Sequence, residues 1–235
     1  MTSGLPERAE CDKAKRFARI KEVLDRRQPD LTIVMENVHK THNLAAILRS
    51  CDAVGVGTVH AVAYSDLLGV RRAAASGSQK WVDLVVHREI QEAYGQLRNS
   101  GFRIFAAESG NNGIDFREVD LRVPSDIVVG AEFDGLSTEA VNLSDESISI
   151  PTAGMVDSLN VSVASAVILF EAQHQRSAAG MYQGCRLDTE SRHRLLFEYT
   201  YPTAVARCKK LGIPYPSLDE SGEVIPGSES HELGL

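Results

Sequence analysis

Short unbroken apolar runs alternate along the chain with segments whose apolar residues recur every three or four positions. The runs predict six strands, at residues 31–37, 58–64, 82–87, 102–109, 126–132 and 146–151. The periodic segments predict helices, at residues 12–27, 43–54, 89–100, 137–142, 158–180, 189–199 and 202–211. Strands without polar alternation that alternate with helices indicate an α/β fold, in which a parallel sheet has helices on both faces.

The stretch HNLAAILRSCDAVG shows the helical spacing most clearly. One apolar stripe contains Leu44, Ile47, Leu48 and Cys51, and a second stripe of small residues contains Ala45, Ala46, Ala53 and also Arg49. We expect the first stripe to pack on the sheet and Asn43 to cap the helix. Spacing alone leaves two interpretations of Arg49, an ion pair with Asp52 at i+3 or a side chain directed at a ligand.

The segment SLNVSVASAVILFEAQHQRSAAG is apolar on almost every side, which predicts a buried helix. Two further helices follow it. The second has Pro202 in its first turn and Gly212 just beyond its end, the expected positions for these residues.

Charge is distributed unevenly along the 235 residues, whose net charge is −7. Bases dominate residues 13–27, whereas the last stretch is acidic and has the composition of a disordered tail. We therefore divide the chain into a basic N-terminal helical extension (1–30), a core (31–176), C-terminal helices (177–216) and a disordered tail (217–235). Four isolated cysteines, no secretory signal and no apolar run of membrane-spanning length favour a cytoplasmic protein without a membrane partner.

Three loops at predicted strand ends carry candidate chemistry, because ligands of parallel sheets bind beyond the carboxyl ends of the strands. They are ENVHKTHNLAAILR (36–49), GAEFDGLS (130–137) and IPTAGMVDSLNVSVA (150–164). In the second, Gly130 permits close backbone approach to a ligand, although a tight turn before a helix capped by Ser137 explains the segment equally well. In the third, Ile150, Met155 and Leu159 suit the faces of an adenine-like ring, although a capping serine on a core helix is an equal alternative.

Other chemistries have weaker support. Gly55-x-Gly57 lacks the third glycine of a dinucleotide site and precedes a strand instead of following one. His39 and His42 have no carboxylate or thiol at ligand spacing, so we expect no metal site. Ser158, Ser162 and Ser165 lack the context of a nucleophilic serine.

Together the three loops resemble the motifs of the SpoU/TrmH family of SPOUT RNA methyltransferases. Asn43 with Arg49 resembles its first motif, GAEFDGL its second, and IPTAGMVDSLNVSVASA its third, which is long and specific. The flanking segments DFREVD, EAQHQRSAAGMY and KKLGIPYP resemble the branch that methylates the ribose of a tRNA guanosine. The resemblance covers residues 15–215.

This resemblance implies a homodimer whose sheet is threaded into a C-terminal trefoil knot, a topology that periodicity alone does not predict. It implies S-adenosylmethionine as cofactor, no metal, and methylation of the ribose 2′-oxygen of guanosine 18 in the D-loop of tRNA. The implied catalytic residues are Asn43, Arg49, Glu132, Ser158 and Asn160. The implied cofactor site contains Ala107, Gly130, Ile150 and Leu159, with Met155 added from the loop pattern. Family members carry a threonine at the position of Ala107, so only a backbone contact would survive there.

Basic side chains are the candidates for holding the tRNA backbone: Lys15, Arg16, Arg19, Lys21, Arg71, Arg72, Arg192, Arg194, Lys209 and Lys210. A guanidinium group is a poor proton acceptor, so Arg49 suits the stabilisation of a developing 2′-alkoxide better than proton removal. Two alternatives stay open, methylation of ribosomal RNA or another tRNA position, and a non-enzymatic RNA-binding protein with a vestigial cofactor site.

Overall fold

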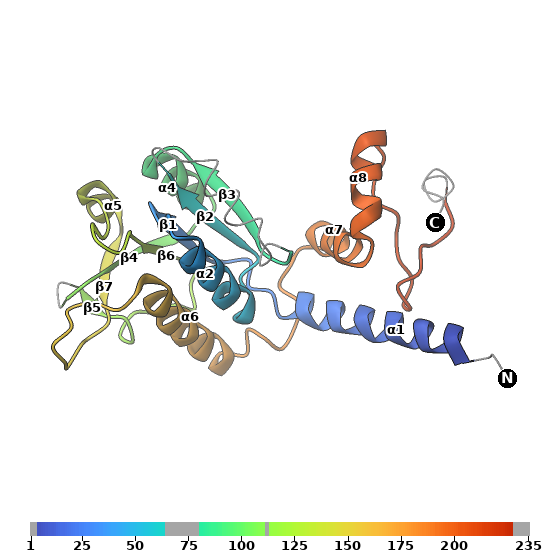
Figure 1. Ribbon diagram of the computed structural model, residues 1–235, viewed down its shortest axis with the longest axis horizontal. Helices are drawn as coiled ribbons and strands as arrows, with labels where there is room; N and C mark the ends of the chain where they lie inside the picture. Colours follow the sequence, from blue (N-terminus) through green and yellow to red (C-terminus); the bar gives the residue numbers. More distant parts are fainter. Residues whose placement is uncertain (1–3, 64–79, 111–112, 228–235) are drawn as a thin grey trace. The chain divides into compact units, whose positions relative to one another are not determined.

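The computed structural model describes residues 4–63, 80–110 and 113–227, which form two compact units (Figure 1). The sheet unit comprises residues 28–182. The terminal unit combines residues 1–27 with residues 183–235. The N-terminal helix and the C-terminal helices therefore share one unit, although they lie at opposite ends of the sequence.

Within the described residues, the sheet unit is built on seven parallel strands in the order β3-β2-β1-β6-β4-β7-β5. The strands are β1 (Leu31–Glu36), β2 (Thr58–Val62), β3 (Asp83–His87), β4 (Arg103–Glu108), β5 (Ile114–Asp115), β6 (Ser125–Val129) and β7 (Glu146–Ser149). The six predicted strands are all present. Strand β5 lies in a segment without a strand pattern, and it is only two residues long. A Cβ on Gly113 would lie 2.7 Å from the backbone of Ser147, so this close pairing needs glycine.

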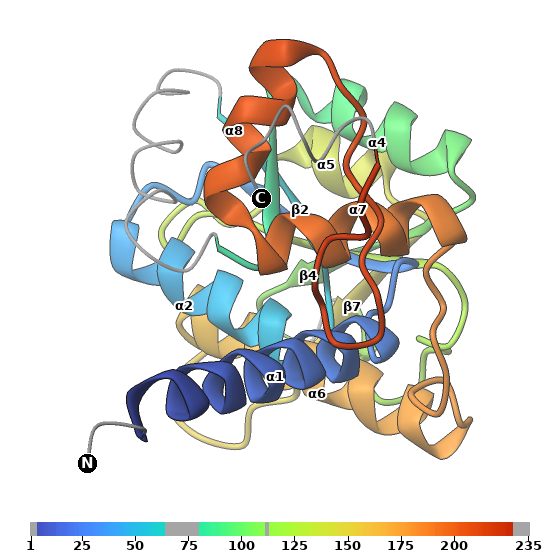
Figure 2. The ribbon, with the colours of Figure 1, turned by 90° about the vertical axis from the view of Figure 1, so that its right-hand side faces the viewer.

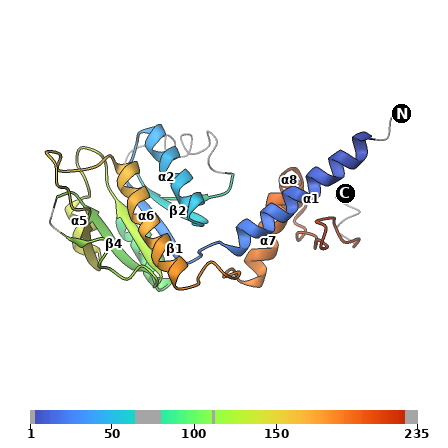
Figure 3. The same ribbon diagram turned by 90° about the horizontal axis from the view of Figure 1, so that it is seen from below.

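Helices cover both faces of the sheet, as predicted. Helices α2 (Thr41–Ala53) and α6 (Val161–Ala178) lie side by side on one face, which Figure 3 shows. Helices α4 (Ile90–Asn99) and α5 (Thr138–Leu143) pack on the other. Since Ile33 and Ile127 face α2 and α6 while Val34 and Val128 face α4 and α5, adjacent residues of β1 and β6 serve two separate cores.

Helices α2 and α6 each differ from the sequence pattern in one respect. The predicted stripe of α2 is buried, but the helix begins at Thr41, so Asn43 lies in its first turn and does not cap it. Helix α6 is buried on only one face. Val163 and Phe170 on its other face are 48% and 50% exposed, so the prediction of a helix buried on almost every side was wrong.

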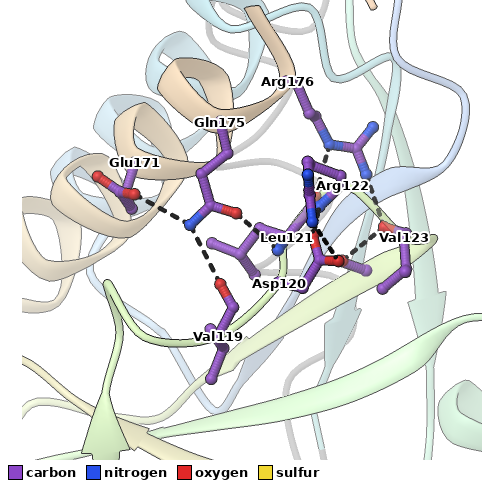
Figure 4. A network of polar contacts seen from close by, with 9 residues as sticks. Val119, Asp120, Leu121, Arg122, Val123, Glu171, Gln175 and Arg176 are labelled. Carbon is purple, nitrogen blue, oxygen red and sulfur yellow. Dashed lines mark hydrogen bonds and ion pairs between the residues drawn. The ribbon is translucent and has the colours of Figure 1, made fainter. Parts of the chain in front are cut away.

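The end of α6 is fastened to the segment that precedes β6 (Figure 4). The fully buried Arg176 donates from Nε to the carbonyl of Leu121 (2.8 Å), from Nη2 to the carbonyl of Val123 (2.8 Å), and from Nη1 to Asp30 Oδ1 (2.6 Å). Gln175 adds two bonds, accepting from the Leu121 amide and donating to the carbonyl of Val119. A buried guanidinium is tolerated only when it is paired and hydrogen-bonded in this way.

The terminal unit consists of α1 (Gly4–Asp25), α7 (Thr189–Thr200) and α8 (Pro202–Leu211). Phe17, Ile20 and Leu24 form the buried side of α1, as their spacing predicts. Helix α1 packs on α7, where Asp25 accepts a charged hydrogen bond from Arg192 (2.9 Å).

Residues 217–227 fold back beside α1, which Figure 2 shows, although we expected them to begin a disordered tail. The Tyr201 hydroxyl donates to the carbonyl of Gly222 (2.9 Å), and Leu218 and Val224 pack on the aromatic cluster of α7 and α8. A Cβ on Gly222 would lie 2.6 Å from the ring of Phe17, so only glycine allows this approach. Residues 228–235 lie outside the described residues.

No helix within the described ranges is long and apolar enough to cross a membrane.

Candidate functional site

A pocket of about 380 Å³ opens at the carboxyl ends of β4, β6 and β7. Its position agrees with the edge at which parallel sheets bind their ligands. Four of the five residues predicted to bind a cofactor line it: Ala107, Gly130, Ile150 and Leu159. Glu132 and Ser158 line it as well. Met155 lies in the same loop as Ile150, but its side chain is 99% exposed.

Three of the predicted catalytic residues meet at one carboxylate. Glu132 Oε1 accepts hydrogen bonds from Asn43 Nδ2 (2.5 Å) and from Asn160 Nδ2 (2.9 Å). The other oxygen of Glu132 forms an ion pair with Lys40. The carboxylate is therefore fixed from α2 on one side and from the start of α6 on the other. Nothing in the sequence pattern pointed to Lys40.

Asn160 has a second task, which explains why an asparagine suits this position. Its Oδ1 accepts from the backbone N–H of Ser162 (2.9 Å) and so caps α6. A residue with both a carbonyl and an amide group satisfies the helix end and Glu132 at the same time.

Gly130 and Gly135 form a tight turn that carries Glu132. Ala131 and Gly135 exchange both backbone hydrogen bonds, at 3.1 and 3.0 Å. A Cβ on Gly130 would lie 2.1 Å from the backbone of Gly135, and Gly135 itself has a φ of +64°. The close approach that we expected Gly130 to offer a ligand is thus already made to its own chain.

Glu36, which the sequence pattern does not single out, holds Ser137, two residues beyond this turn. It is buried at the end of β1, where it accepts hydrogen bonds from the backbone N–H (2.8 Å) and the hydroxyl (2.7 Å) of Ser137. Ser137 in turn caps α5 by accepting from the Ala140 amide (3.0 Å), so the tight turn before a capped helix, one of the two interpretations of this segment, is present. The available signal was a carboxylate that directly follows an unbroken apolar strand.

Arg49 stands apart from this network. It is exposed on α2, six residues beyond Asn43, which corresponds to about 9 Å along the helix axis. Among the described residues no ion pair joins Arg49 to Asp52. The exposed guanidinium is accessible to a ligand.

Acidic side chains give the pocket a negative character. Besides Glu132 they are Glu108, Asp134 and Asp157. Apolar walls come from Ile148, Ile150 and Leu159. A ligand with an aromatic part and a positive charge matches this combination. In the described part of the chain, no group of three or more His, Cys, Asp or Glu side chains could hold a metal ion.

The predicted RNA-binding residues are only partly available. In the terminal unit Arg16 donates to the carbonyl of Tyr199, and Arg19, Arg192 and Arg194 pair with Glu22, Asp25 and Glu198. Lys15, Lys209 and Lys210 are exposed, and Lys21 is half-buried against the ring of Phe17. Arg71 and Arg72 lie outside the described residues.

A parallel sheet covered on both faces, with an acid-lined pocket at its carboxyl edge, defines the class as an α/β ligand-binding protein with appended helices. The SpoU rRNA Methylase family matches residues 30–170, and the C-terminal SpoU methylase family matches residues 174–226. The chain belongs to the SpoU methylase family.

Several known proteins are similar to this one in sequence or structure over most of its length. The tRNA (guanosine(18)-2′-O)-methyltransferase of Escherichia coli K12 is 48% identical over 211 residues, 89% of this chain and 92% of that one. The protein of the same name from Thermus thermophilus is 52% identical over 78% of this chain and 95% of its own. The crystal structure of the Aquifex aeolicus TrmH/SpoU tRNA modifying enzyme matches with a TM-score of 0.73 and 38% identity, covering 81% of this chain and 98% of the other.

Proposed function

We propose that this protein transfers a methyl group from S-adenosylmethionine to the ribose 2′-oxygen of guanosine 18 in the D-loop of tRNA. The observation that carries the proposal is the meeting of Asn43, Glu132 and Asn160 beside the pocket at the sheet edge. Its support comes from the relatives in E. coli and T. thermophilus, whose names specify that reaction.

The pocket fits the cofactor. Apolar walls suit the faces of an adenine ring, and the four carboxylates suit a sulfonium and an ammonium group. A relative from Streptomyces viridochromogenes was crystallised with this cofactor and matches with a TM-score of 0.55 and 25% identity, over 66% of this chain and 59% of its own. When bound, S-adenosylmethionine supplies an already activated methyl group, so the reaction needs no metal.

The task left to the protein is to align the ribose oxygen and to stabilise its negative charge as it develops. We assign charge stabilisation to Arg49, whose guanidinium is exposed on α2. Its planar guanidinium can hold the neighbouring phosphate and the 2′-oxygen together, while the proton leaves through phosphate or water. Glu132, held by Asn43 and Asn160, fixes the turn at the pocket, and Ser158 lies on the pocket wall.

We further propose that the protein acts as a cytoplasmic homodimer whose C-terminal segment forms a trefoil knot. The apolar outer face of α6, with Val163 and Phe170 about half exposed, supports a contact between two copies. Membership in the family supports the knot. The terminal unit, which carries Lys15, Lys209 and Lys210, would hold the tRNA backbone.

The test is to incubate the protein with labelled S-adenosylmethionine and unmodified tRNA, and to locate the methyl group by nucleoside mass spectrometry. We expect 2′-O-methylguanosine at position 18 and nowhere else. A methyl group on another nucleotide, or on ribosomal RNA only, would support the second activity, for which a 23S rRNA methyltransferase of Vibrio parahaemolyticus at 35% identity is the precedent. Failure to bind the cofactor in calorimetry would favour a non-enzymatic RNA-binding protein.

A further inference from the structure

Phe133 is a large apolar side chain left almost completely in water at the mouth of the pocket. Its side chain is 92% exposed, yet the residue is one of those that line the pocket. A single exposed aromatic residue is ordinary on a protein surface. Two further features distinguish this one, namely the rigidity of its backbone and the cation beside its ring.

The turn that presents Phe133 is fixed at both ends. Ala131 and Gly135 exchange two backbone hydrogen bonds around it, and the absent Cβ of Gly130 lets the two arms of the turn touch. The preceding residue, Glu132, is anchored to α2 through Asn43 and to α6 through Asn160. The backbone that carries the ring is therefore already ordered, so the loop loses little conformational entropy when a partner binds.

Lys40 places a positive charge beside the same ring. Its ammonium lies 5.5 Å from the centroid of Phe133 and is also paired with Glu132. A cation near one face of a phenyl ring is attracted by the ring's negative quadrupole. The opposite face stays open to a flat partner, and the ammonium lies within reach of a phosphate attached to that partner.

We propose that Phe133, backed by Lys40, is the platform on which the purine base of the target nucleotide stacks. The inference rests on the proposed function, because a ribose at the sheet edge brings its own base to the pocket mouth. A base that leaves its stacked neighbours when its ribose enters the site loses their stacking, and an aromatic side chain compensates for that loss. Stacking does not read the base edge, so Phe133 supplies affinity for the displaced base, whichever base it is.

The test compares two tRNAs, one with guanosine and one with an abasic ribose at position 18, in binding to four proteins. These are the wild type and the variants Phe133→Ala, Phe133→Leu and Phe133→Trp. We expect Phe133→Ala to weaken binding of the guanosine tRNA about 5- to 150-fold and to leave binding of the abasic tRNA unchanged. Phe133→Trp should bind both tRNAs like the wild type, and Phe133→Leu, which is apolar without an aromatic face, should resemble Phe133→Ala.

Equal weakening of both tRNAs, or no weakening of either, would overturn the proposal. If another molecule contacts the Phe133 ring, the variants give a different result. A lower affinity for S-adenosylmethionine in Phe133→Ala would assign the ring to the cofactor, and a change in sedimentation would assign it to a second copy of the chain. Ile114→Ala removes an apolar side chain that is 41% exposed on β5 and does not line the pocket, and it should bind both tRNAs like the wild type.

Failure of the proposed function has its own readout. If the wild type leaves guanosine 18 unmethylated but binds the two tRNAs with a difference that disappears in Phe133→Ala, the reaction assignment is wrong and the stacking assignment stands. If the wild type methylates guanosine 18 and the Phe133→Ala variant shows no such difference in binding, the stacking assignment alone is wrong.

Discussion

The carboxylate of Glu36 accepts hydrogen bonds from both the hydroxyl (2.7 Å) and the backbone N–H (2.8 Å) of Ser137, a residue 101 positions later in the chain. The pair joins the end of β1 to the loop that carries Glu132. Replacing the buried Glu36 by alanine leaves two donors of the half-buried Ser137 without their acceptor, and a buried unsatisfied group typically costs about 1–3 kcal/mol.

We therefore expect Glu36→Ala to lower the free energy of unfolding in urea and to slow methyl transfer, because the turn at residues 131–135 loses its support. Glu36→Gln retains one acceptor, so its free energy of unfolding should lie between those of the wild type and Glu36→Ala. Unchanged stability of both variants would show that water replaces the carboxylate at no cost.

Gly130 and Gly154 provide a matched pair of substitutions near the same pocket. A Cβ on Gly130 would overlap the backbone of Gly135 at 2.1 Å, whereas a Cβ on Gly154 would meet nothing within 4 Å. We expect Gly130→Ala to abolish S-adenosylmethionine binding in calorimetry and Gly154→Ala to bind it like the wild type. Similar affinities of the two variants would contradict a role for the close backbone approach.

Arg49 is predicted to act on the developing charge and not on cofactor affinity. We expect Arg49→Ala to reduce the single-turnover rate of methyl transfer by about 10²–10³-fold, the usual effect of losing one charge-stabilising contact. Arg49→Lys keeps the charge but loses the planar fork, so it should also be impaired. Binding of S-adenosylmethionine should be unchanged in both. A full rate in Arg49→Lys would refute the bidentate hypothesis.

The salt dependence of tRNA binding should separate lysines that are available from arginines that are already paired. Lys209 and Lys210 are exposed at the end of α8 without an ion-pair partner among the described residues, whereas Arg194 pairs with Glu198. Replacing either lysine by glutamine should reduce the slope of log affinity against log salt by about one. Arg194→Gln is the comparison, and we expect a smaller change in slope. Equal slopes for the wild type and both lysine variants would remove α8 from the tRNA interface.

The sheet unit should lose stability in acid because of a buried histidine pair. His60 Nδ1 lies 2.9 Å from His87 Nε2. Burial, with a smaller effect of His87, lowers the pKa of His60 to about 4 from an ordinary value near 6.5. Protonation therefore favours the unfolded chain. The contribution of His60 is fully present above about pH 6.5 and is lost as the pH falls towards 4, by up to roughly 3 kcal/mol.

Urea unfolding at several pH values measures this loss. We expect His60→Gln to flatten the dependence between pH 6.5 and 4, since glutamine can keep a hydrogen bond without titrating. His174→Gln, which changes an exposed histidine on α6, should leave the dependence as it is in the wild type. If His60→Gln shows the same dependence of unfolding free energy on pH as the wild type, groups other than His60 cause the loss of stability in acid.

The sequence predicted most of the sheet, because its central strands are buried on both faces and therefore consist mainly of apolar residues. It failed where contacts distant in sequence decide the structure. Strand β5 depends on the fit of Gly113 against Ser147, and no local pattern reveals it. Asn43 has the composition of a helix cap, but its side chain turns to Glu132, 89 residues away.

The candidate site likewise contains residues that the sequence predicted and residues that only the folded chain brings together. Asn43, Glu132 and Asn160 were found through their motifs, and the structure brings them together. Lys40 contacts Glu132, and Glu36 contacts Ser137 in the same loop. In the sequence these two residues belong to no motif, because a surface lysine and a glutamate at a strand end are common. Helix α6 shows the opposite error, since composition alone does not distinguish an apolar face buried in the core from an apolar face that stays exposed.

The docking of α1 sets an order on biosynthesis. Its partners are Arg192, Tyr199 and the turn at Gly222, all of which a ribosome adds more than 160 residues after Asp25. Helix α1 is thus synthesised before all of these partners, and it cannot make these contacts until residues 192–222 have been translated. A premature stop codon before residue 217 would leave an intact sheet unit attached to a helix without the turn against which Phe17 packs.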